Sequence, residues 1–172
     1  ASFAYAIDWR DYNAGRALAA LQGKGLNARA AFQPFTTATA QGEVHFAAGS
    51  LVIPVAGQPL QGAALLEALS AAAREAGVQV HALSSGRSHE GIDLGSDGVR
   101  ALRTPSVALV MGEGVAATEI GSAWFLLDKQ LRLPASKLDP QQLGKVALDR
   151  YTTIVLSGGT YNGVDGTAVA AL

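Results

Sequence analysis

The chain contains no cysteine, and only 16% of its 172 residues are charged. The lack of cysteine excludes disulfides, thiolate metal ligands and a thiol nucleophile. Thirteen Lys and Arg against fourteen Asp and Glu give a formal net charge of -1, so the sequence predicts no nucleic-acid partner and no membrane partner. No apolar run approaches the roughly 20 residues that a membrane-spanning helix needs. The sequence does not begin with basic residues followed by an apolar run, which is the pattern of a signal peptide.

Hydrophobic residues make up 49% of the sequence, which suffices for one ordinary domain or two small ones. Along the chain, short apolar runs alternate with segments in which apolar residues recur at helical spacing. Residues 107–111 read as a strand buried on both faces, and residues 61–76 as a helix that ends at Gly77. A further helix follows residue 111, and Trp124 and Leu127 are expected to be buried on it. This alternation predicts an α/β fold, a mostly parallel sheet with helices on both faces.

Residues 84–104 are rich in Gly, Ser and charged side chains and show no clear period. We interpret them as a linker or a long functional loop between two α/β portions, residues 1–103 and 104–172. From about residue 166 the pattern is that of an amphipathic helix that stops after one or two turns. A helix this short is marginal alone, so we expect the second portion to be truncated at its C-terminus.

The best candidate motif is Gly112-Glu113-Gly114, which leads through Val115 and Ala116 to Ala117. It follows a predicted buried strand and precedes a helix, and so fits a loose dinucleotide-binding fingerprint. Glu113 and Glu119 weigh against this reading, because they bring negative charge to a place meant for phosphate. A plain strand-to-helix turn explains the same residues.

A second turn, at Gly158 and Gly159, follows another predicted strand. Ligands of open parallel sheets bind outside the carboxyl ends of the strands. We therefore expect any ligand or partner to meet a contact rim, named here as a set: Gly112, Glu113, Gly114, Glu119, Gly158, Gly159 and Tyr161. The rim is acidic and favours a basic or neutral partner group, with Tyr161 offering stacking or hydrogen bonding. The competing interpretation is two solvated turns without a partner.

No catalytic or metal-binding set is evident. The histidines His45, His81 and His89 lack HxxE or HExxH spacing. The acidic stretch from Asp93 to Asp97 lacks a calcium loop's third-position oxygen ligand and its bidentate Glu. Ser157 has no GxSxG context. We assign no catalytic residue and no metal ligand within this chain.

Several segments together resemble the region downstream of the catalytic domain in large bacterial zinc carboxypeptidases. They are Ala4-Tyr-Ala-Ile-Asp-Trp9, Gly49-Ser-Leu-Val-Ile-Pro54, Gly91-Ile-Asp-Leu-Gly-Ser96, Pro105-Ser-Val-Ala-Leu109, Gly121-Ser-Ala-Trp-Phe-Leu-Leu-Asp128 and Tyr151-Thr-Thr-Ile-Val-Leu-Ser-Gly-Gly159. The resemblance spans most of the chain in order and rests on the spacing of Gly, Trp, Pro and aliphatic residues.

The resemblance implies a non-catalytic domain similar to class I glutamine amidotransferases, with a flavodoxin-like sheet. It places zinc only in the parent's preceding catalytic domain, with no cofactor in this fragment. It implies a periplasmic or secreted parent. The implied role is an accessory one, in which the fragment stabilises the peptidase or contacts its peptide or cell-wall substrate. No position here can inherit the amidotransferase nucleophile, because the chain has no Cys and ends soon after Gly159.

Two other functions remain open at this point. One is a small-molecule or nucleotide-binding α/β module that uses the turn at residues 112–118. The other is an oligomerisation domain, which light scattering coupled to gel filtration would reveal. The accessory interpretation predicts an isolated chain without peptidase activity and without stoichiometric zinc.

Overall fold

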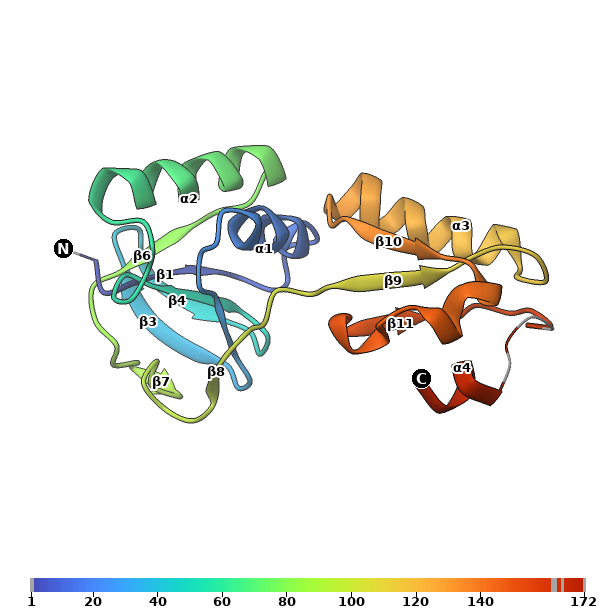
Figure 1. Cartoon of the computed structure of the whole chain (residues 1–172). Coiled ribbons are helices and arrows are strands. Elements are labelled where there is room, and N and C mark those ends of the chain that lie inside the picture. Colours follow the sequence, from blue (N-terminus) through green and yellow to red (C-terminus); the bar gives the residue numbers. More distant parts are fainter. Residues whose placement is uncertain (1, 162–163, 165, 172) are drawn as a thin grey trace. The chain divides into compact units, whose positions relative to one another are not determined.

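The computed structural model describes residues 2–161, 164 and 166–171. The chain divides into two compact units, Ala1–Arg103 and Thr104–Leu172. Each unit has its own sheet and its own hydrophobic core (Figure 1). Within the described ranges, no helix has the length and apolar character needed to cross a membrane.

The first unit is built on a mainly antiparallel sheet of eight strands. Its main path has the order β4-β3-β6-β1-β5-β2-β8, and β7 pairs with β3. The strands are β1 (Ala4–Ile7), β2 (Arg29–Ala31), β3 (Phe35–Thr39), β4 (Gly42–Phe46), β5 (Leu51–Pro54), β6 (His81–Leu83), β7 (Glu90–Gly91) and β8 (Val99–Ala101). The helices are α1 (Ala14–Gly23) and α2 (Gly62–Ala76).

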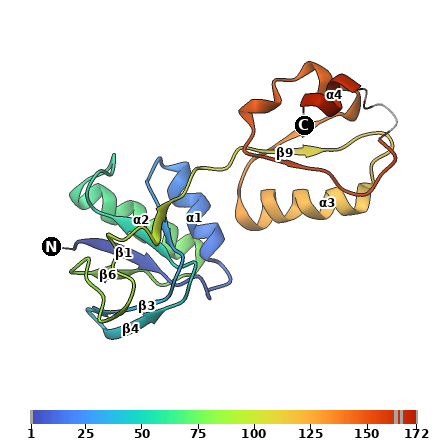
Figure 2. The same cartoon turned by 90° about the horizontal axis from the view of Figure 1, so that it is seen from below.

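Side chains of the central strands alternate between two cores. Ile7, Leu51 and Ile53 face α1 and α2, whereas Ala6 and Val52 face the other side. Both helices lie on one face of the sheet (Figures 1 and 2). The predicted end of α2 is confirmed, since Gly77 adopts the left-handed conformation that closes a helix.

Residues 84–104 are not a linker between the units. All of them except Thr104 belong to the first unit, where they supply β7 and β8. Leu94 and Val99 complete the core on the face away from the helices. This segment shows no hydrophobic periodicity because it is mostly irregular chain that covers one face of the sheet. It contains just two short strands.

The second unit is a three-stranded parallel sheet with the order β10-β9-β11. Its strands are β9 (Val107–Val110), β10 (Ala135–Leu138) and β11 (Thr153–Val155). All four residues of β9 are buried at the centre of this sheet, which confirms the predicted doubly buried strand. The helical segments are α3 (Ala117–Phe125), η1 (Leu126–Leu131), η2 (Pro140–Lys145), η3 (Leu148–Arg150) and α4 (Gly166–Ala171).

The predicted mostly parallel, glutamine amidotransferase-like or flavodoxin-like fold is wrong for this chain. Eight strands form a mainly antiparallel sheet, and among the described residues a parallel sheet occurs only in the small second unit. The strands β3 and β4 are joined by a tight hairpin with Thr39 opposite Gly42, and β5 pairs antiparallel with both β1 and β2. Apolar periodicity marks where strands lie but not which way their neighbours run, so the sequence pattern was compatible with either arrangement.

The expected burial of Trp124 and Leu127 is also wrong. Ile120 is the buried residue of α3, whereas Trp124 of α3 and Leu127 of η1 are only half-buried. A sheet of three strands is too narrow to cover the whole helix face. Lys137 of β10 lies over the Trp124 ring, with its Nζ 4.4 Å from the ring centroid.

Candidate functional site

The contact rim lies at one edge of the second unit's sheet. Because β9, β10 and β11 run parallel, their carboxyl ends meet at the same edge. The loop after β9 carries Gly112, Glu113 and Gly114, and the loop after β11 carries Gly158, Gly159 and Tyr161. Glu119 stands in the first turn of α3, which begins at the same edge.

The two loops are hydrogen-bonded to each other. The Thr160 N–H donates to the Gly114 carbonyl at 2.8 Å, and the Ala116 N–H donates to the Gly158 carbonyl at 2.7 Å. Val115 and Gly159 form an isolated antiparallel bridge between them. The rim is therefore a pair of loops joined by backbone hydrogen bonds, not two independent turns.

Glu119 links the two loops through its side chain. Its Oε2 accepts a hydrogen bond from the Gly158 N–H at 2.7 Å. A carboxylate in the first turn of a helix also interacts favourably with the positive end of the helix dipole. In the nucleotide-binding alternative, a phosphate would meet this helix start and this glycine turn. The side chain of Glu119 already places a negative charge there.

The rim glycines are explained by the closeness of the two loops. A Cβ on Gly159 would lie 2.4 Å from the Gly114 carbonyl oxygen, and a Cβ on Gly158 would lie 3.0 Å from Glu119 Oε2. Gly114 has φ +81°, in the left-handed region, and its Cβ would lie 2.9 Å from Thr160 Oγ1. The glycines thus serve loop-to-loop packing, a role that their sequence pattern shares with phosphate binding.

Tyr161 also has an internal partner. Its hydroxyl donates to the Ser157 carbonyl at 2.6 Å, and the side chain packs against the core on one face of the sheet. The hydroxyl is consequently engaged within its own loop, contrary to the expectation that it faces a partner. Glu113 is exposed and, within the described chain, makes no side-chain hydrogen bond or ion pair, so the rim presents its carboxylate outward.

The rim has a further acidic member. Asp139 follows β10, and a Cβ on Gly112 would lie 3.2 Å from its Oδ2. Its Oδ1 accepts from the Gln141 N–H at 2.8 Å, so Asp139 caps the helical turn that Pro140 begins. The chain segments that follow β9 and β10 thus bring Glu113, Glu119 and Asp139 to one edge of the sheet.

A second polar group, which was not predicted from the sequence, lies at one end of the first unit's sheet. Arg10 Nε lies 3.1 and 3.0 Å from the two carboxylate oxygens of Asp8, and its Nη2 donates to the His45 carbonyl at 2.9 Å. Burial by itself would raise the pKa of Asp8, but the hydrogen bonds and positive charge of Arg10 outweigh it and hold this pKa below its ordinary value. The sequence feature that indicates this group is Asp8-Trp9-Arg10, which directly follows β1.

His81 lies near this group and is buried, with 8% of its surface exposed. Its ring and that of Phe46 form a T-shaped pair with 5.3 Å between centroids. Its Nδ1 is buried and has no hydrogen-bond partner in the described chain. Burial lowers the pKa of His81, and the negative charge of Asp8 opposes this effect only in part.

We expect the first unit to lose stability as the pH falls below about 6.5, the ordinary histidine value. The folded state binds the His81 proton less readily than the unfolded state, so its advantage is full above that pH and declines below it. Urea unfolding at pH 7.5 and pH 5.5 measures this, and His81→Leu should show a smaller decline than the native chain. Equal declines in the two proteins would contradict the assignment to His81.

Among the described residues, no group of three or more His, Cys, Asp or Glu side chains is placed to hold a metal ion. The expectation of a chain without stoichiometric zinc stays a prediction for metal analysis. No family model, no curated protein and no solved structure matches the chain.

Proposed function

We propose that this chain is a non-catalytic accessory region of a secreted bacterial zinc carboxypeptidase, and that its acidic rim contacts the catalytic domain or its peptide or cell-wall substrate. The carboxypeptidase context is supported by the sequence resemblance alone. The contact role is supported by the geometry of the second unit. The two parts of the proposal therefore have separate tests.

The observation that carries the contact role is the hydrogen bond from the Gly158 N–H to Glu119. It fixes both loops, so the rim needs no ligand to order it. A preformed surface loses little conformational freedom when it binds a partner. Glu113 remains exposed at this surface, where a basic group of the partner would find an acceptor.

Exposed apolar side chains of the second unit also support a partner. Phe125 and Leu126, at the junction of α3 and η1, are 52% and 46% exposed, and Leu156 after β11 is 48% exposed. Such side chains contribute to binding where a partner covers them. They are not required for the rim proposal, which depends on the charged groups.

The nucleotide-binding alternative has less support. A phosphate at the start of α3 would have to displace Glu119 from the Gly158 N–H and would also approach Glu113. We expect ADP, NAD and FMN to leave the melting temperature unchanged. A ligand present at 100 times its dissociation constant would stabilise the chain by about 2.7 kcal/mol, an effect that a thermal shift assay detects easily.

The contact role is tested in the full-length protein with two rim variants. Glu113→Lys should leave the fold of the second unit intact, because Glu113 is exposed, and should weaken domain docking or raise the KM for a peptide substrate about tenfold. The companion variant, Glu119→Gln, retains an oxygen acceptor for the Gly158 N–H and removes one rim charge, so it should weaken docking less than the charge reversal in Glu113→Lys. Unchanged docking, stability and KM in Glu113→Lys would rule out the contact role.

The carboxypeptidase context has its own test. The full-length protein should carry an upstream domain with an HxxE pair and a distant His, bind zinc there and release C-terminal residues from peptides. A full-length protein without such a domain would remove the carboxypeptidase context and leave the rim to be explained by another partner.

A further inference from the structure

Among the described strands, the outermost ones of the two sheets are β4 and β8 in the first unit and β10 and β11 in the second. Three of them carry an exposed charged side chain: Glu43 on β4, Arg100 on β8 and Lys137 on β10. A charged side chain on an edge strand disfavours pairing with a further strand. No charged residue lies between Tyr151 and Ser157, the stretch that contains β11, so this edge lacks that protection.

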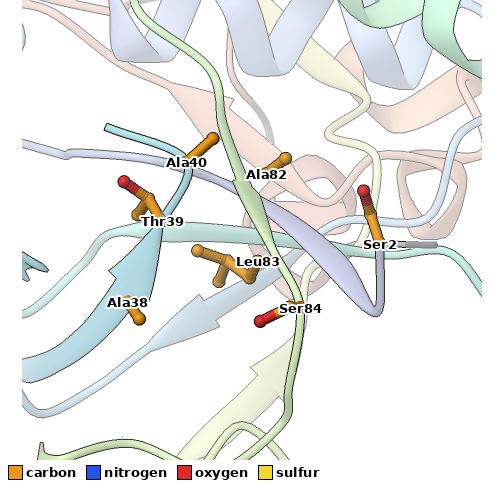
Figure 3. Close-up of a pocket in the computed structure, with 7 residues that line it drawn as sticks. All are labelled: Ser2, Ala38, Thr39, Ala40, Ala82, Leu83 and Ser84. Carbon is orange, nitrogen blue, oxygen red and sulfur yellow. The ribbon is translucent and has the colours of Figure 1, made fainter. Parts of the chain in front are cut away.

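The inner strands of the first unit offer no comparable edge. β6 pairs with β1 and, through Leu83, with Thr39 of β3. A hollow of about 310 Å³ lies where β3 leaves β6, and small or buried side chains line it (Figure 3). This hollow contains no charged group and no large exposed apolar side chain. The outer edge of β11 is therefore the better place for a further strand to add.

The backbone of β11 is paired on one side. Among the described strands, β11 pairs with β9 alone. The Thr153 N–H donates toward β9, to the Ser106 carbonyl at 3.3 Å. Backbone groups of successive residues in a strand point to opposite sides, so the N–H and carbonyl of Ile154 point away from β9. Ile154 thus offers one donor and one acceptor at the outer edge.

A hollow of about 470 Å³ lies along β11. Leu148, Tyr151 and Ile154 line it and also pack in the core on that face of the sheet. Leu156 lines the same hollow and is 48% exposed. It stands two residues after Ile154, so its side chain leaves the strand on the same face. The edge therefore combines an apolar hollow with an exposed apolar side chain.

Two copies of this edge are complementary in one antiparallel register. Ile154 lies opposite Ile154 of the second copy, and the two residues exchange both backbone hydrogen bonds about a two-fold axis. Leu156 then lies opposite Thr152 of the second copy, which lines that copy's hollow. Residues opposite each other in a sheet share a face, so Leu156 of each copy covers the hollow of the other.

The charges agree with the same register. It brings Arg150 of one copy to the level of Gly158 of the second copy, where the Glu119 carboxylate accepts the Gly158 N–H. Arg150 is exposed, and its guanidinium lies 5.2 Å from the centroid of the Tyr151 ring. Opposite charges at both ends of a symmetric interface favour one register over others. Shape and charge thus point to the same occupant, a second copy of this chain.

We propose that this chain forms a two-fold symmetric dimer in which the outer edges of β11 pair antiparallel about Ile154 and join the two parallel sheets into one. Leu156 and Arg150 are the residues that select this partner and this register. The dimer goes beyond the accessory role and does not depend on the carboxypeptidase context.

The first test measures the mass of the whole chain by light scattering coupled to gel filtration, and the dimer dissociation constant by sedimentation over a dilution series. We expect a dimer that dissociates on dilution. Leu156→Lys should raise the dissociation constant about tenfold or more, because it places a charge on the edge. Leu126→Lys is the matched control, since Leu126 is 46% exposed and lies in η1, and it should dimerise like the native chain.

The second variant tests the charge contact. Arg150→Glu should also raise the dissociation constant about tenfold or more, because it places like charge against Glu119 of the second copy. Arg150→Lys keeps the charge and should stay within a few-fold of the native chain. Circular dichroism of each variant checks that the fold is retained.

A cross-link tests the register, since the native chain has no cysteine. Only a residue on the two-fold axis lies opposite itself, and such a hydrogen-bonded pair has Cα atoms about 5.5 Å apart, within disulfide range. With oxidised glutathione as the oxidant, Ile154→Cys should form a disulfide-linked dimer. Lys137→Cys, on the outer edge of β10, should stay monomeric on a non-reducing gel.

Three results would each overturn the proposal. A native chain that is monomeric at every concentration would leave the edge to another partner. Native-like dimerisation of both Leu156→Lys and Arg150→Glu would place the dimer contact on another face. Equal cross-linking of Ile154→Cys and Lys137→Cys would show random collision instead of the stated register. The contact role of the rim is tested separately, by docking in the full-length protein.

Discussion

Replacement of Gly159 by alanine is expected to open the rim and to lower the free energy of unfolding of the second unit by about 3 kcal/mol. The new Cβ would lie 2.4 Å from the Gly114 carbonyl oxygen and 3.0 Å from the Val115 Cα. Both are backbone atoms, so no side-chain rotation can relieve the clash. The bridge between Val115 and Gly159 should then separate, and the Glu119 hydrogen bond to Gly158 should weaken with it.

Urea unfolding followed by tryptophan fluorescence measures this effect. The chain has two tryptophans, Trp9 in the first unit and Trp124 in the second, so a Trp9→Phe background reports on the second unit. Gly121→Ala is the control, because Gly121 lies in α3 with open space around its Cβ position and alanine favours helix there. The control should be as stable as the native chain or up to about 1 kcal/mol more stable. A Gly159→Ala variant as stable as the native protein would show that the loops do not pack as described.

The second large effect is expected at Phe46, where substitution by alanine should cost about 3–5 kcal/mol of the first unit's unfolding free energy. Phe46 is fully buried. Its ring stacks on Phe35 at 4.8 Å between centroids with an interplanar angle of 17°, and it meets the His81 ring edge-on. Its removal leaves a cavity among groups held by three strands, β3, β4 and β6, which cannot close without distortion of the sheet.

A Trp124→Phe background lets Trp9 report on the first unit in this experiment. Phe32→Ala serves as the control, since Phe32 is 57% exposed and its main ring contact is the Arg100 guanidinium at 5.0 Å. This control should change stability by no more than about 1 kcal/mol. A cost below 1 kcal/mol for Phe46→Ala would contradict the described core of the first unit.

Short-range features of the fold could be predicted from the sequence because neighbouring residues determine them. The helix stop at Gly77 requires a residue that adopts positive φ easily. The cap at Asp139 requires a short acceptor just before Pro140. The buried strand β9 requires only four successive apolar residues. Each of these needs information from a few adjacent positions.

Long-range features could not be predicted, because they depend on which segments meet. Strand direction in the first unit follows from pairings such as Ala6 with Val52 and Thr37 with Val44, and an apolar alternation is the same in a parallel and an antiparallel neighbour. The role of residues 84–104 likewise depends on the uncovered sheet face beneath them. Half-burial of Trp124 depends on the width of a three-stranded sheet.

The features of the candidate sites likewise fall into those set by neighbouring residues and those set by long-range packing. Composition and residue order alone exclude thiol chemistry, give almost no net charge, and place a glycine turn after each of two apolar runs, with two glutamates after the first. The hydrogen bond between Glu119 and Gly158 follows from the folding of the second unit, since 39 residues separate the two in the chain. The hollow that Leu148, Ile154 and Leu156 line beside β11 likewise forms only in the folded unit. A hydrogen bond or a hollow requires groups a few ångströms apart, and their distance in space is set by the packing of the whole unit rather than by their spacing in the sequence.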